Sequence, residues 1–427
     1  MRYGFLAILL LLTVIFQTLW PVYEFYAHRH AVPRLGADYI ALPNSDTDPA
    51  PQNQKVYVSA YQGVTETVLT TLERHRQAIR SPGISAAVAI DGELVWAGTS
   101  GWANIKDNRP LTVESQFRIG STSKALTATL LATMVDAEQL SLDTPLAQFQ
   151  VGQLNASWQD ITPRQLASHM SGIPHYNGNS DWRGLLRTMA LDSHYQDVAD
   201  SVLLFDDSDL LFAPGESFEY SSLGTVLLSA VMQEALGETY QQAMQDRVFS
   251  QLGMQHTRAE PDMASRNSET ANLVTFYWHP NDQSNQVAPW RDVDLSHRLA
   301  GGGYISTSSD LVKLGLGFNS PHFISQQTRD AFWIPQTLNS GQVNPQKYAI
   351  GWRVRESDFG DEIGTLFHAN HGGVSRGAQS WLMVIPQYNM AVAVNINAKT
   401  DPFWDFGKVS FELVRLFLIH RHTVLSS

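Results

Sequence analysis

The sequence predicts an α+β fold in which one antiparallel β-sheet, built from both chain ends, is flanked by helices. Strand patterns occur early, at residues 84–97, and again late, at residues 379–395. Between them, from about residue 125 to 290, the patterns are mainly helical, which predicts an inserted helical lobe and a cleft beside the sheet. A strongly apolar N-terminal segment predicts one transmembrane helix before the domain.

The composition is that of a globular enzyme. The chain has 427 residues, of which 43% are hydrophobic and 16% are charged. A formal net charge of -12, without a basic stripe interleaved with aromatic residues, argues against nucleic acid as a partner. The absence of cysteine excludes disulfides, thiolate chemistry and cysteine-ligated metals.

The N-terminus predicts a membrane anchor, assigned to residues 1–31. The apolar run 4–20 follows Arg2 and is near the lower length limit for a helix that spans a bilayer. An interfacial aromatic belt follows, made of Trp20, Tyr23, Phe25 and Tyr26. Residues 21–30 offer no pair of small residues for signal cleavage. We therefore expect an uncleaved anchor, the membrane as a partner, and a catalytic domain outside the cytoplasm.

The segment that follows is predicted to be a linker, and the domain to occupy residues 55–427. Residues 32–54 are rich in Pro, Asp, Asn and Ala and show no periodic apolar pattern. A helical pattern then runs from about Val56 to Arg80. Asp91-Gly92 is a hairpin signal between two apolar runs. The remaining expected elements are strands at 84–90, 93–97, 348–354, 379–385 and 391–395, a helix that Thr162 caps and Pro163 opens, and a final helix at 403–420.

Ser121 and Lys124 are candidates for a nucleophile and its base. They lie three residues apart, so on a helix they share one face. The helix predicted behind them, residues 125–135, is apolar on nearly all sides and is therefore expected to be buried. Burial lowers the pKa of a lysine, which can then take the proton of a serine hydroxyl. The alternative is a Ser-x-x-Lys pattern that arises by chance on a solvated helix face.

Tyr220 is a candidate general base. It follows a turn at residues 213–219 and precedes an apolar helical stretch. Nearby cations lower the pKa of a tyrosine, so beside Lys124 its phenol can exchange protons. The alternative is a core tyrosine whose hydroxyl is satisfied by hydrogen bonds.

A glycine-rich segment, His371-Gly372-Gly373-Val374, lies before the predicted strand 379–385. Glycines allow the backbone to approach a ligand closely, and a backbone N–H can then face an oxyanion. The alternative is an ordinary turn or bulge at a strand entry.

Taken in order, three motifs resemble those of the serine β-lactamase and penicillin-binding-protein superfamily. They are Ser121-Thr122-Ser123-Lys124, Tyr220-Ser221-Ser222 and His371-Gly372-Gly373. The resemblance is to its class C and esterase-like branch, which includes mitochondrial serine β-lactamase-like proteins. It implies a β-lactamase/transpeptidase-like fold, no cofactor and no metal.

The resemblance also implies roles for individual residues. Ser121 would be acylated, and Lys124 and Tyr220 would move its proton. The N–H groups of Ser121 and Val374 would form the oxyanion hole. The remaining substrate-binding positions would be Ser222, His371, Gly372 and Gly373. His169 and His175 are interpreted as structural, because they lack a metal-binding His-Glu-x-x-His arrangement.

Two departures from the pattern argue against penicillin as the substrate. Ser222 replaces an Asn that is common in β-lactamases, and Gly372 replaces a Thr that helps to hold the substrate carboxylate. Arg376 can supply a carboxylate contact, or it can be a solvated loop arginine. We therefore expect an esterase or peptidase that acts on a small-molecule or peptide acyl substrate, with weak β-lactam activity at best. The alternatives are a catalytically silent scaffold and a penicillin-binding D-amino-acid carboxypeptidase.

Overall fold

A central antiparallel sheet organises the computed structural model, which describes residues 2–28, 31–43, 49–152, 155–262, 271–281 and 284–425. The strand order is β11-β12-β13-β14-β3-β4-β2, and β5 pairs with β4. The strands are β2 (Gln52–Val56), β3 (Gly83–Ile90), β4 (Glu93–Asn104), β5 (Arg109–Pro110), β11 (Arg353–Asp358), β12 (Thr365–Ser375), β13 (Ala378–Ile385) and β14 (Met390–Ile396). Because β14 pairs with β3, from Ala391↔Ala89 to Ile396↔Ile84, the sheet joins both ends of the chain as predicted.

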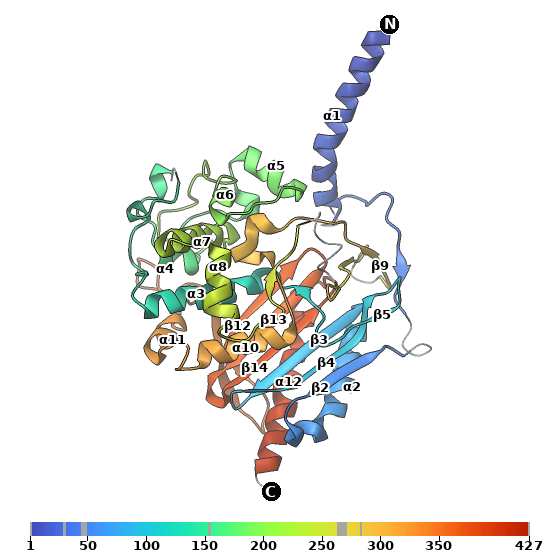
Figure 1. Ribbon diagram of the computed structural model, residues 1–427, viewed down its shortest axis with the longest axis vertical. Coiled ribbons are helices and arrows are strands. Elements are labelled where there is room, and N and C mark those ends of the chain that lie inside the picture. Colours follow the sequence, from blue (N-terminus) through green and yellow to red (C-terminus); the bar gives the residue numbers. More distant parts are fainter. Residues whose placement is uncertain are drawn as a thin grey trace.

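Each face of the sheet has its own core. Along β3, Ile84, Ala86 and Val88 pack with α2 (Thr65–Ala78) and α12 (Phe403–Leu425), whereas the alternate residues Ala87 and Ala89 belong to the core on the opposite face. This follows from the two-residue period of side chains along a strand. The opposite face carries α10 (Ser308–Asn319) and, beyond it, the helical lobe (Figure 1).

The helical lobe forms the green part of Figure 1, beside the sheet. Its helices are α3 (Ser123–Asp136), α4 (Pro163–Ala167), α5 (Trp182–Ala190), α6 (Val198–Val202), α7 (Ser222–Leu236) and α8 (Tyr240–Met244), and α11 (Gln326–Phe332) follows later. Two small sheets have the strand orders β1-β9-β8 and β6-β10-β7. Their strands are β1 (Ile40–Ala41), β9 (Gln286–Pro289), β8 (Tyr277–Trp278), β6 (Phe117–Arg118), β10 (Tyr304–Ser306) and β7 (Arg258–Ala259).

Short helical turns connect these elements. They are η1 (Ser59–Val64), η2 (Gly120–Thr122), η3 (Leu146–Gln148), η4 (Ala156–Trp158), η5 (Tyr176–Gly178), η6 (Gln245–Phe249), η7 (Ser296–Arg298), η8 (Leu299–Gly303) and η9 (Pro386–Tyr388). Among them η2 and η8 matter for function, because both contribute to the surroundings of Ser121.

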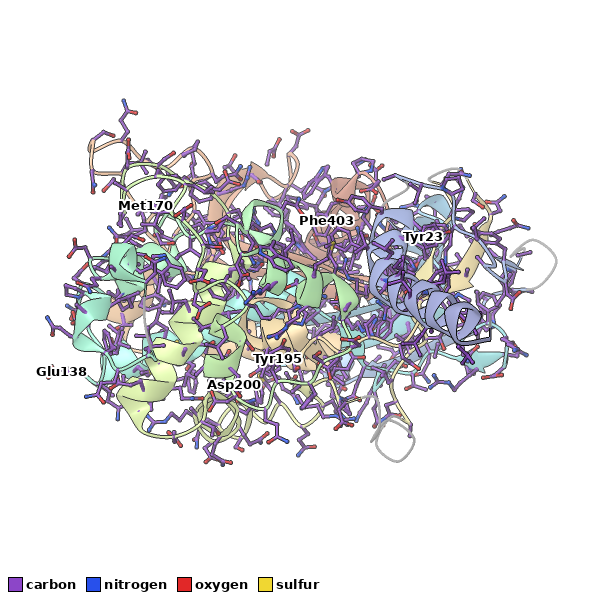
Figure 2. All side chains as sticks on the ribbon, turned by 90° about the horizontal axis from the view of Figure 1, so that it is seen from above. Tyr23, Glu138, Met170, Tyr195, Asp200 and Phe403 are labelled. Atoms are coloured by element: carbon purple, nitrogen blue, oxygen red, sulfur yellow. The ribbon has the colours of Figure 1, made fainter. Side chains whose placement is uncertain are left out.

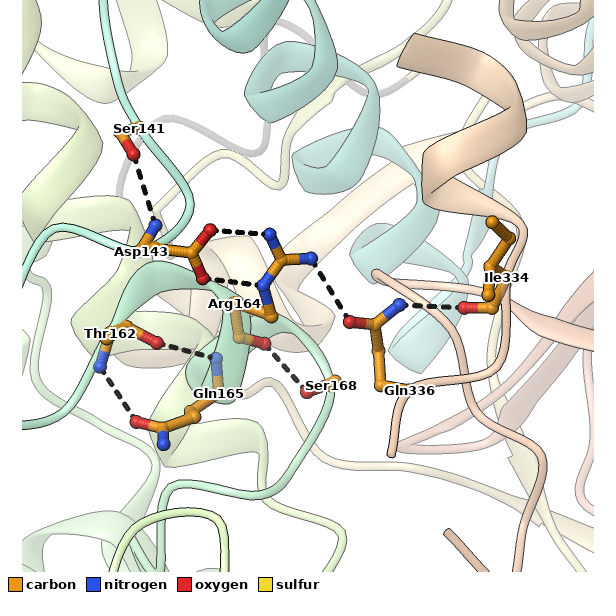
Figure 3. A network of polar contacts seen from close by, with 8 residues as sticks. All are labelled: Ser141, Asp143, Thr162, Arg164, Gln165, Ser168, Ile334 and Gln336. Carbon is orange, nitrogen blue, oxygen red and sulfur yellow. Dashed lines mark hydrogen bonds and ion pairs between the residues drawn. The ribbon is translucent and has the colours of Figure 1, made fainter. Parts of the chain in front are cut away.

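The predicted start of α4 is confirmed, and α4 links the lobe to a distant segment. Thr162 and Gln165 form a reciprocal capping box, and Pro163 opens the helix (Figure 3). The Arg164 guanidinium donates two hydrogen bonds to Asp143 and one, at 3.2 Å, to Gln336. Because the Gln336 N–H donates to the carbonyl of Tyr348 at 3.0 Å, this network fixes the segment that carries Tyr348.

Helix α1 (Arg2–Ala27) projects away from the domain (Figure 1), and Figure 2 views it nearly end-on with Tyr23 labelled. Its last turns contact the domain, since Glu24 forms an ion pair with Arg291 at 2.6 Å and His28 stacks on Trp290. In the part of the chain that the structure describes, no helix is long and apolar enough to cross a membrane. The predicted transmembrane helix is therefore not supported, and the predicted location outside the cytoplasm stays a prediction.

Other boundaries differ from the prediction. The helix expected from Val56 is replaced by the end of β2 and by η1, so α2 begins only at Thr65. Strand β1 and the first residues of β2 lie within the predicted linker. The two residues of β1 pair with β9 and the mostly polar β2 pairs with β4, and neither segment is long or apolar enough to show an alternating pattern. Residues 44–48 of that linker lie outside the described residues. The strand expected at 348–354 begins at Arg353, and Tyr348 makes a single β-bridge.

Candidate active site

Ser121 lies in the turn η2, immediately before α3. Gly120 has a φ of +50°, a left-handed conformation that favours glycine, and this turn presents Ser121 at the start of the helix. A Cβ on Gly120 would lie 2.5 Å from the carbonyl oxygen of Val374, so the backbone of β12 crosses directly beside this turn. The nucleophile candidate and the third motif are thus brought together by backbone packing.

Lys124 lies in the first turn of α3 with its side chain 2% exposed. Its Nζ atom is 3.3 Å from Ser121 Oγ, 2.8 Å from Ser222 Oγ and 2.8 Å from the carbonyl oxygen of Gly301 in η8. Burial lowers its pKa well below the usual range, and the positive charges of Arg353 and Arg298 lower it further. These causes favour a neutral amine.

The contacts of Lys124 decide what that amine can do. A neutral amine has two N–H donors and one lone pair. The carbonyl of Gly301 only accepts, and Ser222 Oγ can accept the second N–H. The lone pair is then left for the proton of Ser121, which makes Lys124 suited to act as a base.

Tyr220 lies one residue before Ser221, the N-cap of α7. Lys124 Nζ lies 4.8 Å and Arg353 Cζ 5.4 Å from the centroid of its ring. Burial nevertheless raises the pKa of Tyr220 to about 12, against the opposing effects of Arg353 and a hydrogen bond with Ser121. The expectation that nearby cations lower the pKa of Tyr220 is wrong, because desolvation raises this pKa by more than the positive charge lowers it. Near neutral pH the phenol therefore keeps its proton.

The glycine-rich segment precedes β13, as predicted, and itself lies within a further strand, β12, which pairs with β13 from Ala369↔Val384 to Ser375↔Ala378. A Cβ on Gly373 would overlap the carbonyl oxygen of Ile119 and lie 2.8 Å from Ser121 N. Only a glycine permits this approach, which places the backbone of Gly373 and Val374 against the Ser121 turn. Gly372 faces the other way, since its Cβ would meet the ring of Phe403 on α12 at 2.6 Å.

His371 is buried on the face of β12 that Ser121 shares. Its Nδ1 lies 2.9 Å from the carbonyl oxygen of Gly372, which only accepts, so Nδ1 carries the proton. Its Nε2 then accepts from the hydroxyl of Tyr348 at 2.8 Å. Burial, Arg353 and Lys124 all lower its pKa well below the usual range, so the imidazole is neutral.

His169 and His175 hold the second motif in place. His169 Nδ1 accepts from the Ser221 N–H at 3.3 Å, and His175 Nδ1 accepts from the Ser222 N–H at 3.1 Å. The ring of His169 also packs against Tyr220, with 4.3 Å between ring centroids. Their predicted structural role thus takes a specific form, because they orient the backbone that carries Tyr220 and Ser222.

The chain is similar in sequence to the proteins of a known family. Residues 69–407 match the family model described as Beta-lactamase, which is more than half of the chain. The chain belongs to the β-lactamase family. The resemblance inferred from the three motifs is thereby confirmed, and with it a place among families of serine hydrolases.

Several named proteins are similar to this β-lactamase-family protein. The human mitochondrial serine β-lactamase-like protein LACTB is 26% identical over 423 residues, covering 81% of this chain and 75% of LACTB. D-aminopeptidase of Gluconobacter oxydans (strain 621H) is 24% identical, and the match covers 74% of this chain and 56% of the D-aminopeptidase. The structure of D-amino acid amidase from Ochrobactrum anthropi SV3 aligns with a TM-score of 0.65 and 21% identity over 84% of this chain and 99% of that chain, which shows a shared fold.

Two residues of this family member's site escaped sequence reasoning. Tyr348 bonds to His371, and Arg353 lies over the rings of Tyr220 and Tyr348, at 5.4 and 5.5 Å from their centroids. Neither belongs to a recognisable motif, because each reaches the site from a loop or strand end defined only by tertiary packing. Residues 348–354 were interpreted as a strand and not as part of the site.

Proposed function

We propose that this protein is a serine hydrolase that forms an acyl-enzyme on Ser121 and cleaves an ester or peptide bond. The observation that carries this proposal is the buried Lys124 amine, 3.3 Å from Ser121 Oγ and held by Ser222 and Gly301. A lysine buried in this way costs free energy, because its charge is desolvated. The cost is understandable if the neutral amine is needed as a base.

The reaction proceeds in two balanced steps. Lys124 takes the proton of Ser121 as Oγ attacks the substrate carbonyl, and the oxyanion accepts hydrogen bonds from the N–H groups of Ser121 and Val374. Tyr220 gives its proton to the leaving group and regains one from Lys124, whose amine becomes neutral again. Water then attacks the acyl-enzyme, the same groups move its proton to Ser121, and the free acid leaves.

Two features support weak rather than efficient β-lactam turnover. The hydroxyl of Ser222 is already 2.8 Å from Lys124 Nζ, so it offers no side-chain amide to a substrate. Residue 372 is a glycine that faces α12, so this position offers no side-chain hydroxyl to a substrate carboxylate. The curated relative D-aminopeptidase, by its name, favours a peptide or amide substrate.

The full-length protein is exposed to a neutral fluorophosphonate and, separately, to a penicillin, and its intact mass is measured. We expect rapid labelling by the fluorophosphonate, slow or no labelling by the penicillin, and no labelling of Ser121→Ala. Equal labelling by both would favour a penicillin-binding carboxypeptidase, as would nitrocefin turnover comparable with a dedicated β-lactamase. No labelling by either would overturn the proposal in favour of a silent scaffold.

A further inference from the structure

Two consecutive carbonyls of η8 bind to one face of α3. The Ala300 carbonyl accepts from Thr127 Oγ1 at 2.8 Å, and the Gly301 carbonyl accepts from Lys124 Nζ at 2.8 Å. Lys124 and Thr127 lie three residues apart on the helix, so their side chains are neighbours on its surface. The helix that carries the candidate base therefore binds two adjacent peptide units of the segment that faces the amine.

The other neighbours of η8 leave it little room to move. A Cβ on Gly301 would lie 3.0 Å from the carbonyl oxygen of Ser222, so η8 packs closely against the start of α7. A Cβ on Gly302 would lie 3.5 Å from the carbonyl carbon of Gly120, in the turn that presents Ser121. Displacement of η8 would therefore change the surroundings of the nucleophile candidate, its base and the second motif together.

The hydroxyl of Thr127 has one proton to donate and two lone pairs. It lies 2.8 Å from the carbonyl oxygen of Ala300, 3.1 Å from that of Ser123 and 2.8 Å from the hydroxyl of Tyr240. If Thr127 donated to Tyr240, two acceptor oxygens, those of Thr127 and Ala300, would face each other without a proton between them. Thr127 therefore donates to Ala300, and the phenol of Tyr240 donates to Thr127.

Tyr240 connects this arrangement to a third helix. It is 0% exposed and begins α8, which lies beside α3 and α7 (Figure 1). Its backbone N–H donates to Gln233 Oε1 on α7 at 3.0 Å. Burial raises the pKa of Tyr240, so the phenol keeps its proton and can donate it in a hydrogen bond. A chain of hydrogen bonds thus runs from Tyr240 through Thr127 to Ala300, one peptide unit from the carbonyl that binds Lys124.

A second buried threonine of α3 shows that burial alone does not require this bond. Thr129 is 0% exposed, and its hydroxyl donates to the Ala125 carbonyl of the same helix at 2.7 Å. Among the described residues this hydroxyl bonds to no other element. Helical threonines commonly satisfy their hydroxyl in this way. Thr127 has the same option at Ser123 but lies closer to the carbonyl of Ala300.

We propose that Thr127 and Tyr240 are positioning residues for the lysine base. They hold η8 so that the Gly301 carbonyl stays fixed against the amine, and the lone pair of that amine stays directed at Ser121. This inference rests on the proposed function, because it concerns the base of the same site. Neither residue touches the reacting atoms, so each acts through η8. Displacement of a catalytic group by about 1 Å can slow a reaction about 100-fold, so a small shift of η8 is sufficient.

The test is the rate of fluorophosphonate labelling of the full-length protein at increasing reagent concentration, which gives a maximal rate and a half-saturating concentration. Thr127→Val should lower the maximal rate at least about tenfold without changing the half-saturating concentration, because the hydroxyl orients the base and does not bind the reagent. Thr127→Ser keeps the hydroxyl and should restore most of the rate, and Tyr240→Phe should lower it severalfold. Thr129→Val, the same change on the same helix, should leave the maximal rate unchanged.

Three results would overturn the positioning role if the wild type is labelled. One is an equal maximal rate for Thr127→Val and Thr129→Val, since the bond to η8 would then make no difference. Another is a change confined to the half-saturating concentration, which would indicate a contact with the reagent. The third is a Thr127→Ser variant as slow as Thr127→Val, which would point to packing of the methyl groups.

Urea unfolding separates this proposal from the proposed function. The shifts in urea midpoint caused by Lys124→Met and Thr127→Val should not be additive in the double variant, because both side chains bind η8. The shifts caused by Lys124→Met and Thr129→Val should be additive. If the wild type is not labelled, the hydrolase proposal falls, and these double variants decide the rest. Non-additive shifts for the first pair alone would keep the joint hold on η8, and additive shifts for both pairs would overturn it.

Discussion

The hydroxyl of Ser222 lies 2.8 Å from Lys124 Nζ, whereas that of its neighbour Ser221 turns away and donates to the carbonyl of Pro174 at 2.8 Å. Ser221 Oγ also accepts from the Gly224 N–H as the N-cap of α7. Two adjacent serines therefore do different things. The first supports the helix, and the second holds the amine that faces Ser121.

Replacing these serines separates chemistry from stability. Ser222→Ala should slow fluorophosphonate labelling by about 10- to 100-fold, because a hydrogen bond to an ionisable group is worth ~1.5–3 kcal/mol. Ser221→Ala should instead lower the free energy of unfolding by about 1 kcal/mol through loss of the N-cap. Labelling kinetics and urea unfolding of both variants provide the measurement, and similar labelling rates for the two would contradict the role of Ser222.

The labelling rate should depend on pH through Lys124. Only the neutral amine can accept the proton of Ser121, so the rate should rise with pH and level off at a midpoint well below 10.5, the ordinary lysine value. Tyr220, whose pKa is raised to about 12, should add no limb below pH 10. Tyr220→Phe should therefore lower the plateau without moving the midpoint, and a midpoint shifted in that variant would argue for tyrosinate as the base.

Lys124 should also reduce stability near neutral pH. Its pKa is lower in the folded than in the unfolded protein, so the unfolded chain binds more protons and stability rises with pH in this window. Lys124→Met should remove that penalty and unfold at a higher urea concentration at pH 7. The advantage should shrink as the pH approaches 10.5, where the unfolded lysine loses its proton as well. An advantage that does not vary with pH would point to packing instead.

Neighbouring glycines of β12 should respond differently to a methyl group. Gly373→Ala should abolish labelling of Ser121, because the new Cβ would overlap Ile119 O and displace the Ser121 turn. Gly372→Ala places its Cβ against the ring of Phe403 on the opposite face, so it should lower stability but leave most of the labelling rate. Intact-mass labelling together with thermal unfolding distinguishes these results, and equal loss of labelling would show that β12 moves as a whole.

Arg118 and Glu260 form a buried pair whose disruption should be costly. Their side chains are 2% and 3% exposed, and Arg118 also donates to the carbonyl of Arg376 at 2.8 Å. Arg118→Gln should lower the free energy of unfolding by about 3–5 kcal/mol, because the buried Glu260 carboxylate loses its ion pair with Arg118. Arg74→Gln, which breaks an exposed pair with Glu412, should cost no more than about 1 kcal/mol in the same urea titration.

The sheet and the proximity of Ser121 to Lys124 were predictable because they are encoded locally. The Asp91-Gly92 turn, the nearly continuous apolar run of β3 and the all-round apolar helix α3 each act within a short stretch of sequence. The strand character of β12 was hidden, because its glycines have low strand propensity and are retained for the close approach to Ser121.

Other parts of the site depend on packing that no local pattern encodes. The pKa of Tyr220 is decided by the balance between burial and the charge of Arg353, and only the folded chain defines that balance. Thr127 and Ala300 come from segments far apart in sequence and meet where η8 packs against α3. The membrane-spanning interpretation of α1 was based on its apolar run, its aromatic belt and the lack of a cleavage pattern, and these could not anticipate that Glu24 and His28 contact the domain.

The pairing of β14 with β3 has a consequence for biosynthesis. Ala391 to Ile396 must align with Ile84 to Ala89 before the two parts of the sheet become one, and β12 must be added before Gly373 can settle on the Ser121 turn. A ribosome must have translated the chain through Ile396 before these contacts are possible. Ser121 and Lys124 are translated long before β12 and β14, so a nascent chain that ends before these strands has not yet assembled the candidate site.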